Sequence, residues 1–169
     1  MGFVAKLCRE VSPRSFAAKR KEKLKYFFSA IRSPGPGRGL ALGIPVDAVA
    51  SLVFFSGELT GPVEDDGDEQ RFSVPHFFGF SGEEIRHGLV LKGEGPRRVL
   101  LVSSVEREIE FPPEGICAPP SILKALGVYG FLSGLCFTGG DSGDFLPLLL
   151  IDPFKLAEEM VRRETERML

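Results

Sequence analysis

The sequence contains no tryptophan and few of the residues that most enzymes use for chemistry. It has two histidines, His76 and His87, and three cysteines, Cys8, Cys117 and Cys136. The cysteines are odd in number and not in CxxC spacing, so they suggest neither a disulfide framework nor a zinc site. The histidines lie outside the HExxH and GxSxG motifs of zinc proteases and α/β-hydrolases. We therefore expect no catalytic residues, no metal, no cofactor and no small-molecule substrate.

Long apolar runs are also missing. No uninterrupted apolar stretch approaches the roughly 20 residues that span a bilayer, and the N-terminus lacks the apolar core of a signal peptide. The 169 residues are 43% apolar, which is typical of one ordinary globular domain or of two very small ones that share a core. We expect a soluble protein of the cytoplasm.

The small net charge of −2 hides an uneven distribution of charge along the chain. Residues 1–38 contain ten Lys and Arg against two acids, whereas residues 39–169 contain eleven against twenty-one. Phe3, Leu7 and Val11 recur at helical spacing, so we predict a basic, partly helical leader over residues 1–23. By charge alone, such a leader attracts an anionic partner, either nucleic acid or a membrane surface.

Twenty glycines and thirteen prolines separate many short apolar stretches, which is the pattern of an all-β protein. Strands are predicted at 24–32, twice within 40–55, and at 71–80, 85–91, 99–105, 131–137 and 145–151. Glycine-rich segments at 93–96 and 139–143 predict two hairpins. Residues 64–69 contain five acids but lack the remainder of an EF-hand, so they predict a solvated, mobile loop.

The segment 98–111 carries the strongest strand pattern. Residues 99–102 are apolar at every position, which predicts burial on both faces of a sheet. From Val105 to Phe111 the residues alternate, so Glu106, Glu108 and Glu110 share one solvated face. We predict one strand that runs from the core to the surface.

The clearest helix is predicted at the C-terminus, over residues 152–169. Asp152 is a natural N-cap and Pro153 suits the first helical position. The apolar stripe that would dock this helix on the sheet is expected to contain Phe154, Val161 and Met168, with Leu156 and Met160 beside them.

Taken together, these segments resemble the CheW-like family of chemotaxis coupling proteins. The family's second half has an apolar strand, a polar alternating strand and a proline-bearing stretch, as in RVLLVSSVEREIEFPPEGICAPPSIL, followed by parts similar to YGFLSGLCFTGG and DFLPLLLIDPFKLAEEM. GLALGIPVDAVASLVFF and FSVPHFF are similar to strands of its first half. The resemblance covers residues 24–160.

The resemblance implies two five-stranded, SH3-like β-barrel subdomains that share a core, meet near residues 81–82 and carry the C-terminal helix. It also implies a non-catalytic adaptor in bacterial chemotaxis or related two-component signal transduction. Such adaptors bridge the regulatory domain of a histidine kinase and the cytoplasmic tip of a chemoreceptor. The implied protein interface comprises Val49, Ser51, Leu52, Val53, Phe54, Val74, Pro75 and Phe77. Because strands alternate, only a subset of these can be exposed.

The sequence departs from the family at a surface pair of a glutamate and an arginine. Ser51 stands where the family has its glutamate, and TGPVEDDGDEQRFSVP, with Arg71 as its arginine, replaces the family's loop. We therefore expect a divergent adaptor that serves a kinase other than the main chemotaxis kinase. The alternative is a β-barrel module with an unrelated partner, recruited to nucleic acid or membrane by the leader. An enzyme that brings Cys117 and a histidine together is the third reading.

Deletion of residues 1–22 is predicted to leave a folded protein, because a domain that begins at Leu24 still contains every predicted strand. Thermal unfolding followed by circular dichroism should show one cooperative transition. A truncated protein without such a transition would place the apolar face of Phe3, Leu7 and Val11 in the core.

Overall fold

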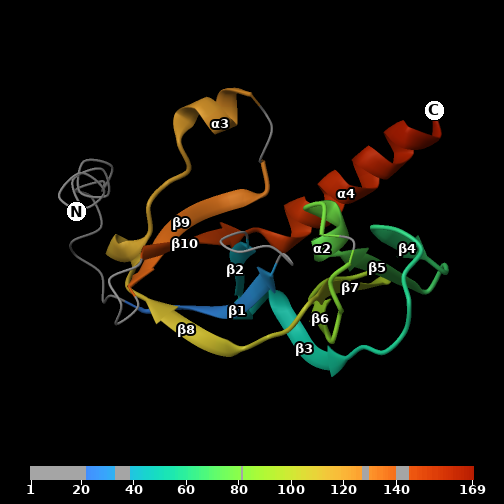
Figure 1. Cartoon of the computed structure of the whole chain (residues 1–169), viewed down its shortest axis with the longest axis horizontal. Coiled ribbons are helices and arrows are strands. Elements are labelled where there is room, and N and C mark those ends of the chain that lie inside the picture. Colours follow the sequence, from blue (N-terminus) through green and yellow to red (C-terminus); the bar gives the residue numbers. More distant parts are fainter. Residues whose placement is uncertain (1–21, 33–38, 81, 127–129, 140–144) are drawn as a thin grey trace.

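The computed structural model describes residues 22–32, 39–80, 82–126, 130–139 and 145–169, so most of the predicted leader and its helices lie outside the described residues. Within these ranges the strands form two five-stranded sheets, followed by a C-terminal helix (Figure 1). The strands are β1 (Leu24–Arg32), β2 (Gly39–Pro45), β3 (Val49–Phe54), β4 (Val63–Asp65), β5 (Glu69–Ser73), β6 (His87–Leu91), β7 (Arg97–Val102), β8 (Arg107–Phe111), β9 (Leu132–Gly139) and β10 (Phe145–Ile151). The helices are α2 (Val74–Phe77), α3 (Ser121–Ala125) and α4 (Pro153–Met168), with short 3-10 turns η2 (Val46–Ala48) and η3 (Pro113–Gly115). The predicted all-β class is confirmed.

The two sheets share one pattern of strand directions. Sheet A has the order β8-β1-β2-β10-β9, and sheet B has the order β3-β6-β7-β5-β4. In both, successive pairs are antiparallel, antiparallel, parallel and antiparallel. The chain therefore consists of two topologically equivalent halves, β1 to α2 and β6 to α4.

Each half contributes to both sheets. Its first hairpin enters one sheet, and its last three strands enter the other. The halves meet between α2 and β6, near the predicted residues 81–82, but the prediction that each half builds its own subdomain is wrong. The chain changes sheet at η2 and again at residues 103–106. As a result β3 and β8 take equivalent edge positions in opposite sheets.

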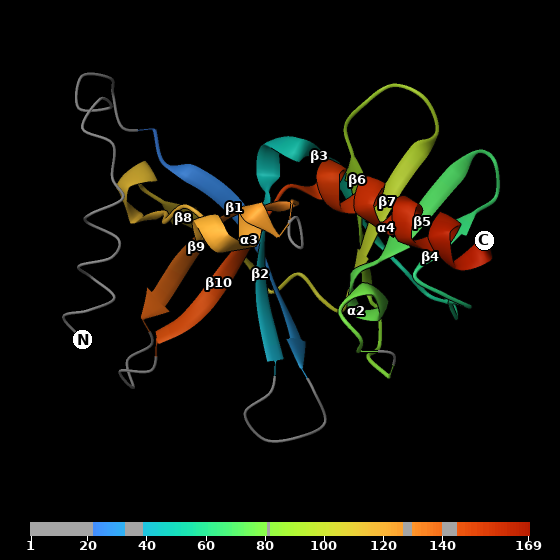
Figure 2. The ribbon, with the colours of Figure 1, turned by 90° about the horizontal axis from the view of Figure 1, so that it is seen from above.

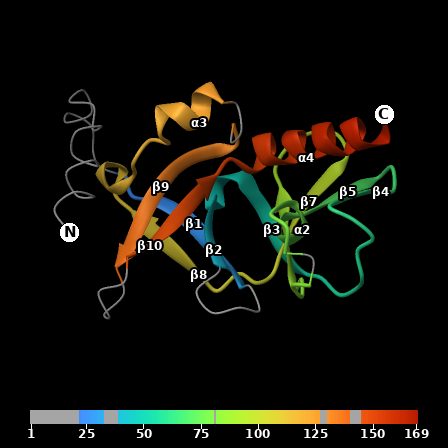
Figure 3. The ribbon, with the colours of Figure 1, turned by 45° about the horizontal axis from the view of Figure 1, so that its top comes forward.

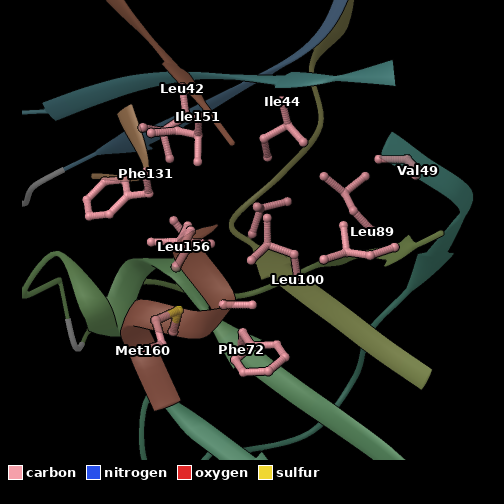
Figure 4. Close-up of a cluster of buried hydrophobic side chains, with 14 of the residues drawn as sticks. Leu42, Ile44, Val49, Phe72, Leu89, Leu100, Phe131, Ile151, Leu156 and Met160 are labelled. Atoms are coloured by element: carbon pink, nitrogen blue, oxygen red, sulfur yellow. The ribbon is translucent and has the colours of Figure 1, made fainter. Parts of the chain in front are cut away.

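An apolar core lies between the sheets and joins them. Figure 4 shows Leu42, Ile44 and Ile151 of sheet A on one side, with Leu89, Leu100 and Phe72 of sheet B facing them and Leu156 and Met160 of α4 alongside. The far face of each sheet has a smaller cluster of its own. These clusters contain Tyr26, Phe28, Cys136, Leu148 and Leu150 on sheet A, and Val90, Val99 and Leu101 on sheet B.

The segment 98–111 confirms its predicted burial pattern but not its predicted continuity. Leu100 lies in the shared core and Leu101 in the far cluster of sheet B, so this segment is covered on both faces. Glu108 and Glu110 are exposed, as the alternation predicted. The prediction of one strand is wrong, because the chain leaves sheet B at Ser103 and β8 pairs with β1 of sheet A.

Two predictions for residues 64–80 are wrong. The acidic segment is not a loop throughout, because β4 and β5 pair across it and Asp65 and Asp66 accept N–H bonds from the turn around Gly67. The predicted strand 71–80 ends at Ser73. The Ser73 hydroxyl accepts the N–H of His76, so it caps α2, and a proline stands at the start of this helix.

Helix α4 begins as predicted but docks through a different stripe. The Asp152 carboxylate accepts the N–H groups of Phe154 and Lys155 at 3.1 and 3.2 Å. The buried residues of α4 are Pro153, Leu156, Ala157 and Met160, whereas Val161 and Met168 are exposed, so their predicted place in the stripe is wrong. Figures 2 and 3 show α4 lying along the side of the molecule formed by sheet B.

Leu101→Asp is predicted to unfold the domain, because Leu101 is fully buried and packs in an apolar cluster, where a carboxylate would be desolvated. The expected cost is several kcal/mol, against a total stability of about 5–15 kcal/mol for a typical domain. Glu108→Ala, on an exposed position of β8, should change the stability by less than about 0.5 kcal/mol. Urea denaturation of both variants tests this, and a Leu101→Asp protein with the wild-type midpoint would contradict it.

Candidate protein-interaction surface

Strand β3 has an open edge. It pairs with β6 on one side, and the Phe55 N–H donates to the Arg86 carbonyl at 2.8 Å. Because main-chain groups alternate, those of Ser51 and Val53 also face β6. The N–H and C=O groups of Leu52 and Phe54 point the other way, and no strand in the described part of the chain pairs with them. This edge therefore presents a row of donors and acceptors.

The side chains of Leu52 and Phe54 make this edge apolar. Leu52 is 45% exposed and Phe54 is 90% exposed. Leu52 lies opposite Leu89 on β6, so its side chain shares the face that carries the common core. The Phe54 ring contacts the imidazole of His87, with 5.3 Å between the ring centroids. The apolar layer of the core thus continues to the surface through these two residues, which we call the β3 patch.

The other face of β3 borders a groove of about 370 Å³. Val53, Val99 and Leu101 contribute apolar lining, and Arg71 and Arg97 line it together with Glu69. Glu69 accepts from Arg71 at 2.8 Å and lies 3.5 Å from Arg97. The hydrogen bond to Glu69 raises the pKa of Arg71 above its ordinary value. The two arginines share this carboxylate, so the charges within the groove are largely paired with each other.

The eight predicted interface residues fall into three groups. Val49, Val74 and Pro75 are buried, Val53 and Phe77 are partly buried, and Ser51, Leu52 and Phe54 are exposed. Val49 enters the shared core because a bulge between Val49 and Ser51 shifts the alternation of β3. Val74 and Pro75 are buried at the start of α2.

Phe77 is a packing residue rather than part of the β3 patch. Its ring makes edge-to-face contacts with Phe78 and Phe131, at 5.1 and 5.4 Å between centroids. The guanidinium of Arg163 on α4 lies 4.5 Å from the centroid of the same ring. Phe77 therefore packs α2 against the C-terminal helix. Phe54 is the exposed aromatic residue of the predicted set.

Both histidines have structural hydrogen bonds. His76 Nδ1 lies 2.7 Å from the Ser73 hydroxyl at the start of α2. His87 Nδ1 accepts the N–H of Val105 at 3.1 Å and so ties sheet B to the crossover between the sheets. Among the described residues, no group of three His, Cys, Asp or Glu side chains is placed to hold a metal ion.

Two features of the surface were missed in the sequence. His87 lies beside Phe54, but the register that pairs them cannot be read from either strand alone. On α3 and just after it, Ile122 and Leu126 are 65% and 64% exposed. Their i,i+4 spacing was the available signal for an exposed apolar pair on one face of a helical turn.

Comparison with known proteins places this arrangement in one fold class. The two five-stranded sheets and the C-terminal helix form a CheW-type fold. A solved structure that shares it is the scaffolding protein TtCheW from Thermoanaerobacter tengcongensis, with a TM-score of 0.50 and 16% sequence identity. The match covers 83% of this chain and 90% of that one. At this identity the likeness shows the fold.

The sequence itself gives no further match. No protein-family model and no curated protein matches the chain. Within the described ranges, no helix has both the length and the apolar character needed to cross a membrane. The CheW-type fold and the β3 patch are therefore the observations on which a functional proposal rests.

The assignment of Phe54 to a surface role and of Phe77 to a packing role predicts opposite effects of truncation. Phe77→Ala should lower the free energy of unfolding by about 2–4 kcal/mol, because the ring loses its contacts with two aromatic neighbours and Arg163. Phe54→Ala should change it by less than about 0.5 kcal/mol. Denaturant unfolding of the two variants makes the comparison, and equal losses would show that Phe54 packs like Phe77.

Proposed function

We propose that this protein is a non-catalytic adaptor of cytoplasmic two-component signalling, in chemotaxis or a related system. In this role it joins a histidine kinase, bound through the kinase's regulatory domain, to a receptor or another partner. The observation that carries the proposal is the 90% exposed ring of Phe54 on the open edge of β3, within a CheW-type fold. An aromatic side chain that is exposed to water is unfavourable in the free protein. Aromatic residues of this kind often contribute a large part of the binding energy of an interface.

An adaptor needs two separate surfaces, and we consider two of the exposed apolar groups in the described part of the chain. The β3 patch lies on the edge of sheet B. Ile122 and Leu126 lie on and just after α3, in the connection between β8 and β9 of sheet A. Figure 1 shows α3 and β3 on opposite sides of the molecule, so two partners could bind without colliding. We assign the kinase to the β3 patch and the second partner to α3.

The polar surroundings support a divergent adaptor. Ser51 is exposed on β3 and carries no charge, so a glutamate–arginine pair cannot form from this strand. Arg71 is paired with Glu69 at 2.8 Å and lies 3.8 Å from Glu64. Recognition of the kinase therefore depends on apolar contact with Leu52 and Phe54 more than on an ion pair, which favours a kinase matched to this chain.

Phe54→Lys is predicted to weaken binding of the cognate kinase regulatory domain at least about 30-fold, the factor that corresponds to loss of a hot spot of about 2 kcal/mol. The melting temperature should not change, because the side chain is exposed. Titration calorimetry with the histidine-kinase regulatory domains of the native organism measures the affinity.

Ile122→Lys provides the matched control, since it places the same charge on an equally apolar exposed position of α3. It should leave kinase binding intact. Wild-type affinity for the kinase in Phe54→Lys would move the kinase site away from β3, and loss of binding in Ile122→Lys alone would place it on α3.

A further inference from the structure

The four sheet edges differ in how they are protected against pairing with another chain. Exposed edge strands usually carry charges, are very short, or are covered. β8 carries Arg107, Glu108 and Glu110, and β4 has three residues of which two are acidic. The outer edge of β9 is bridged by Cys117, which exchanges two hydrogen bonds of 2.8 Å with Leu135. Among the described strands, β3 is the edge with no charge, no proline and no bridging segment.

The bulge at the start of β3 leaves a short regular edge. After the register shift between Val49 and Ser51, pairing with β6 is regular to Phe54. Within this part Leu52 and Phe54 point their N–H and C=O groups outward, so the edge offers two donors and two acceptors. An antiparallel strand placed alongside would form up to four hydrogen bonds and cover the β3 patch.

We propose that β3 of a second copy of this chain occupies this edge, antiparallel and related by a two-fold axis beside Val53. In this register Leu52 of each copy lies opposite Phe54 of the other copy, so the dimer contains two such pairs. All four outward main-chain groups of each copy pair with their equivalents, and the two residues left exposed in the single chain cover each other. An aromatic residue opposite an aliphatic one is a favourable cross-strand pair.

Other registers of the same strand are poorer. A two-fold axis at Leu52 would set Phe54 against Ala50, which lies within the bulge. An axis at Phe54 would set Leu52 against Ser56, a polar residue beyond the end of the strand. Because residues 49–54 contain no charge, the self-pairing brings no like charges together within the strand. The occupant must be extended, uncharged and apolar at alternate positions, and β3 itself has this chemistry.

The dimer and the proposed kinase complex use the same residues, so they exclude each other. Two short strands bury much less than the roughly 1,200–2,000 Å² of a stable interface, so the dimer is weak and depends on concentration. The proposal does not rest on the adaptor function. It gives the free protein a way to cover the β3 patch until a tighter partner displaces the second copy.

Disulfide trapping of the full chain tests both the dimer and its register. In the proposed register Val53 lies opposite Val53 of the second copy as a non-hydrogen-bonded pair, with Cα atoms about 4.5 Å apart, within the range of a disulfide. Val53→Cys should therefore form a covalent dimer under mild oxidation, through a bond between the two introduced thiols identified by peptide mass spectrometry. Ser51→Cys is the matched control, because its two copies would lie about 13 Å apart along the strands and should not link.

Sedimentation equilibrium of the wild-type chain at increasing concentration provides the second measurement. The proposal is supported if the wild-type chain shows a monomer–dimer equilibrium and if Phe54→Lys raises its dissociation constant at least tenfold. Ile122→Lys should leave the dissociation constant unchanged, which would show that the effect is specific to the β3 patch. A wild-type chain that stays monomeric and gives no Val53→Cys dimer overturns the proposal. Equal linking of Ser51→Cys, or a dimer that persists in Phe54→Lys, also overturns it, because another register or surface then forms the dimer. Kinase binding is measured separately, so either proposal can fail while the other stands.

Discussion

The structure depends on one constraint: each sheet must bury a face against the other, because neither sheet has a core large enough to stand alone. The shared cluster draws residues from β1, β2 and β10 on one side and from β3, β5, β6 and β7 on the other. The clusters on the far faces are much smaller, with three fully apolar buried residues on sheet B. Helix α4 closes the shared layer with Leu156, Ala157 and Met160. The two halves of the chain therefore stabilise each other and form one unit.

The exchange of strands strengthens this dependence. Since β3 follows β2 and β8 follows β7, each sheet receives its edge strand from the chain that has just left the other sheet. Separation of the two halves of the chain would thus remove an edge strand from each sheet and break the parallel strand pair within both. His87, which accepts the Val105 N–H, adds a hydrogen bond at one of these crossovers. The imidazole of His87 also contacts the ring of Phe54, so the residue that holds this crossover packs directly against the proposed binding edge.

The sequence predicted those parts of the fold that local pattern determines. β1 was predicted with its observed bounds, and both hairpins and the Asp152 cap were found, because turn residues and side-chain caps act within a few residues. The exchange between sheets was not predictable in this way, since alternation tells which face of a strand is buried but not which sheet it joins. In α4 the buried residues 153, 156, 157 and 160 follow helical spacing, but the sequence is equally compatible with the longer stripe through Val161, which the structure leaves exposed.

The interface residues show the same limit. The aromatic window 71–80 predicted a strand, although Ser73 followed by Pro75 is also a helix start, and this helix turned Phe77 into the molecule. Alternation along β3 was broken by the bulge, which buried Val49 while Leu52 and Phe54 stayed outside. Exposure at a sheet edge follows from strand order, and strand order is a property of the whole chain.

The comparison between β3 and β8 gives the strongest reason to regard the β3 edge as functional. The two strands hold equivalent edge positions, so the fold exposes both to the same risk of unwanted pairing. On β8 that risk is met with Arg107 and two glutamates, which make addition of another strand costly. On β3 the equivalent positions carry leucine and phenylalanine, which make it favourable. The fold alone does not require this difference, because β8 shows that a charged edge is compatible with it. An exposed apolar edge lowers solubility, and β3 carries such an edge whereas β8 does not. A partner that binds β3 explains this difference.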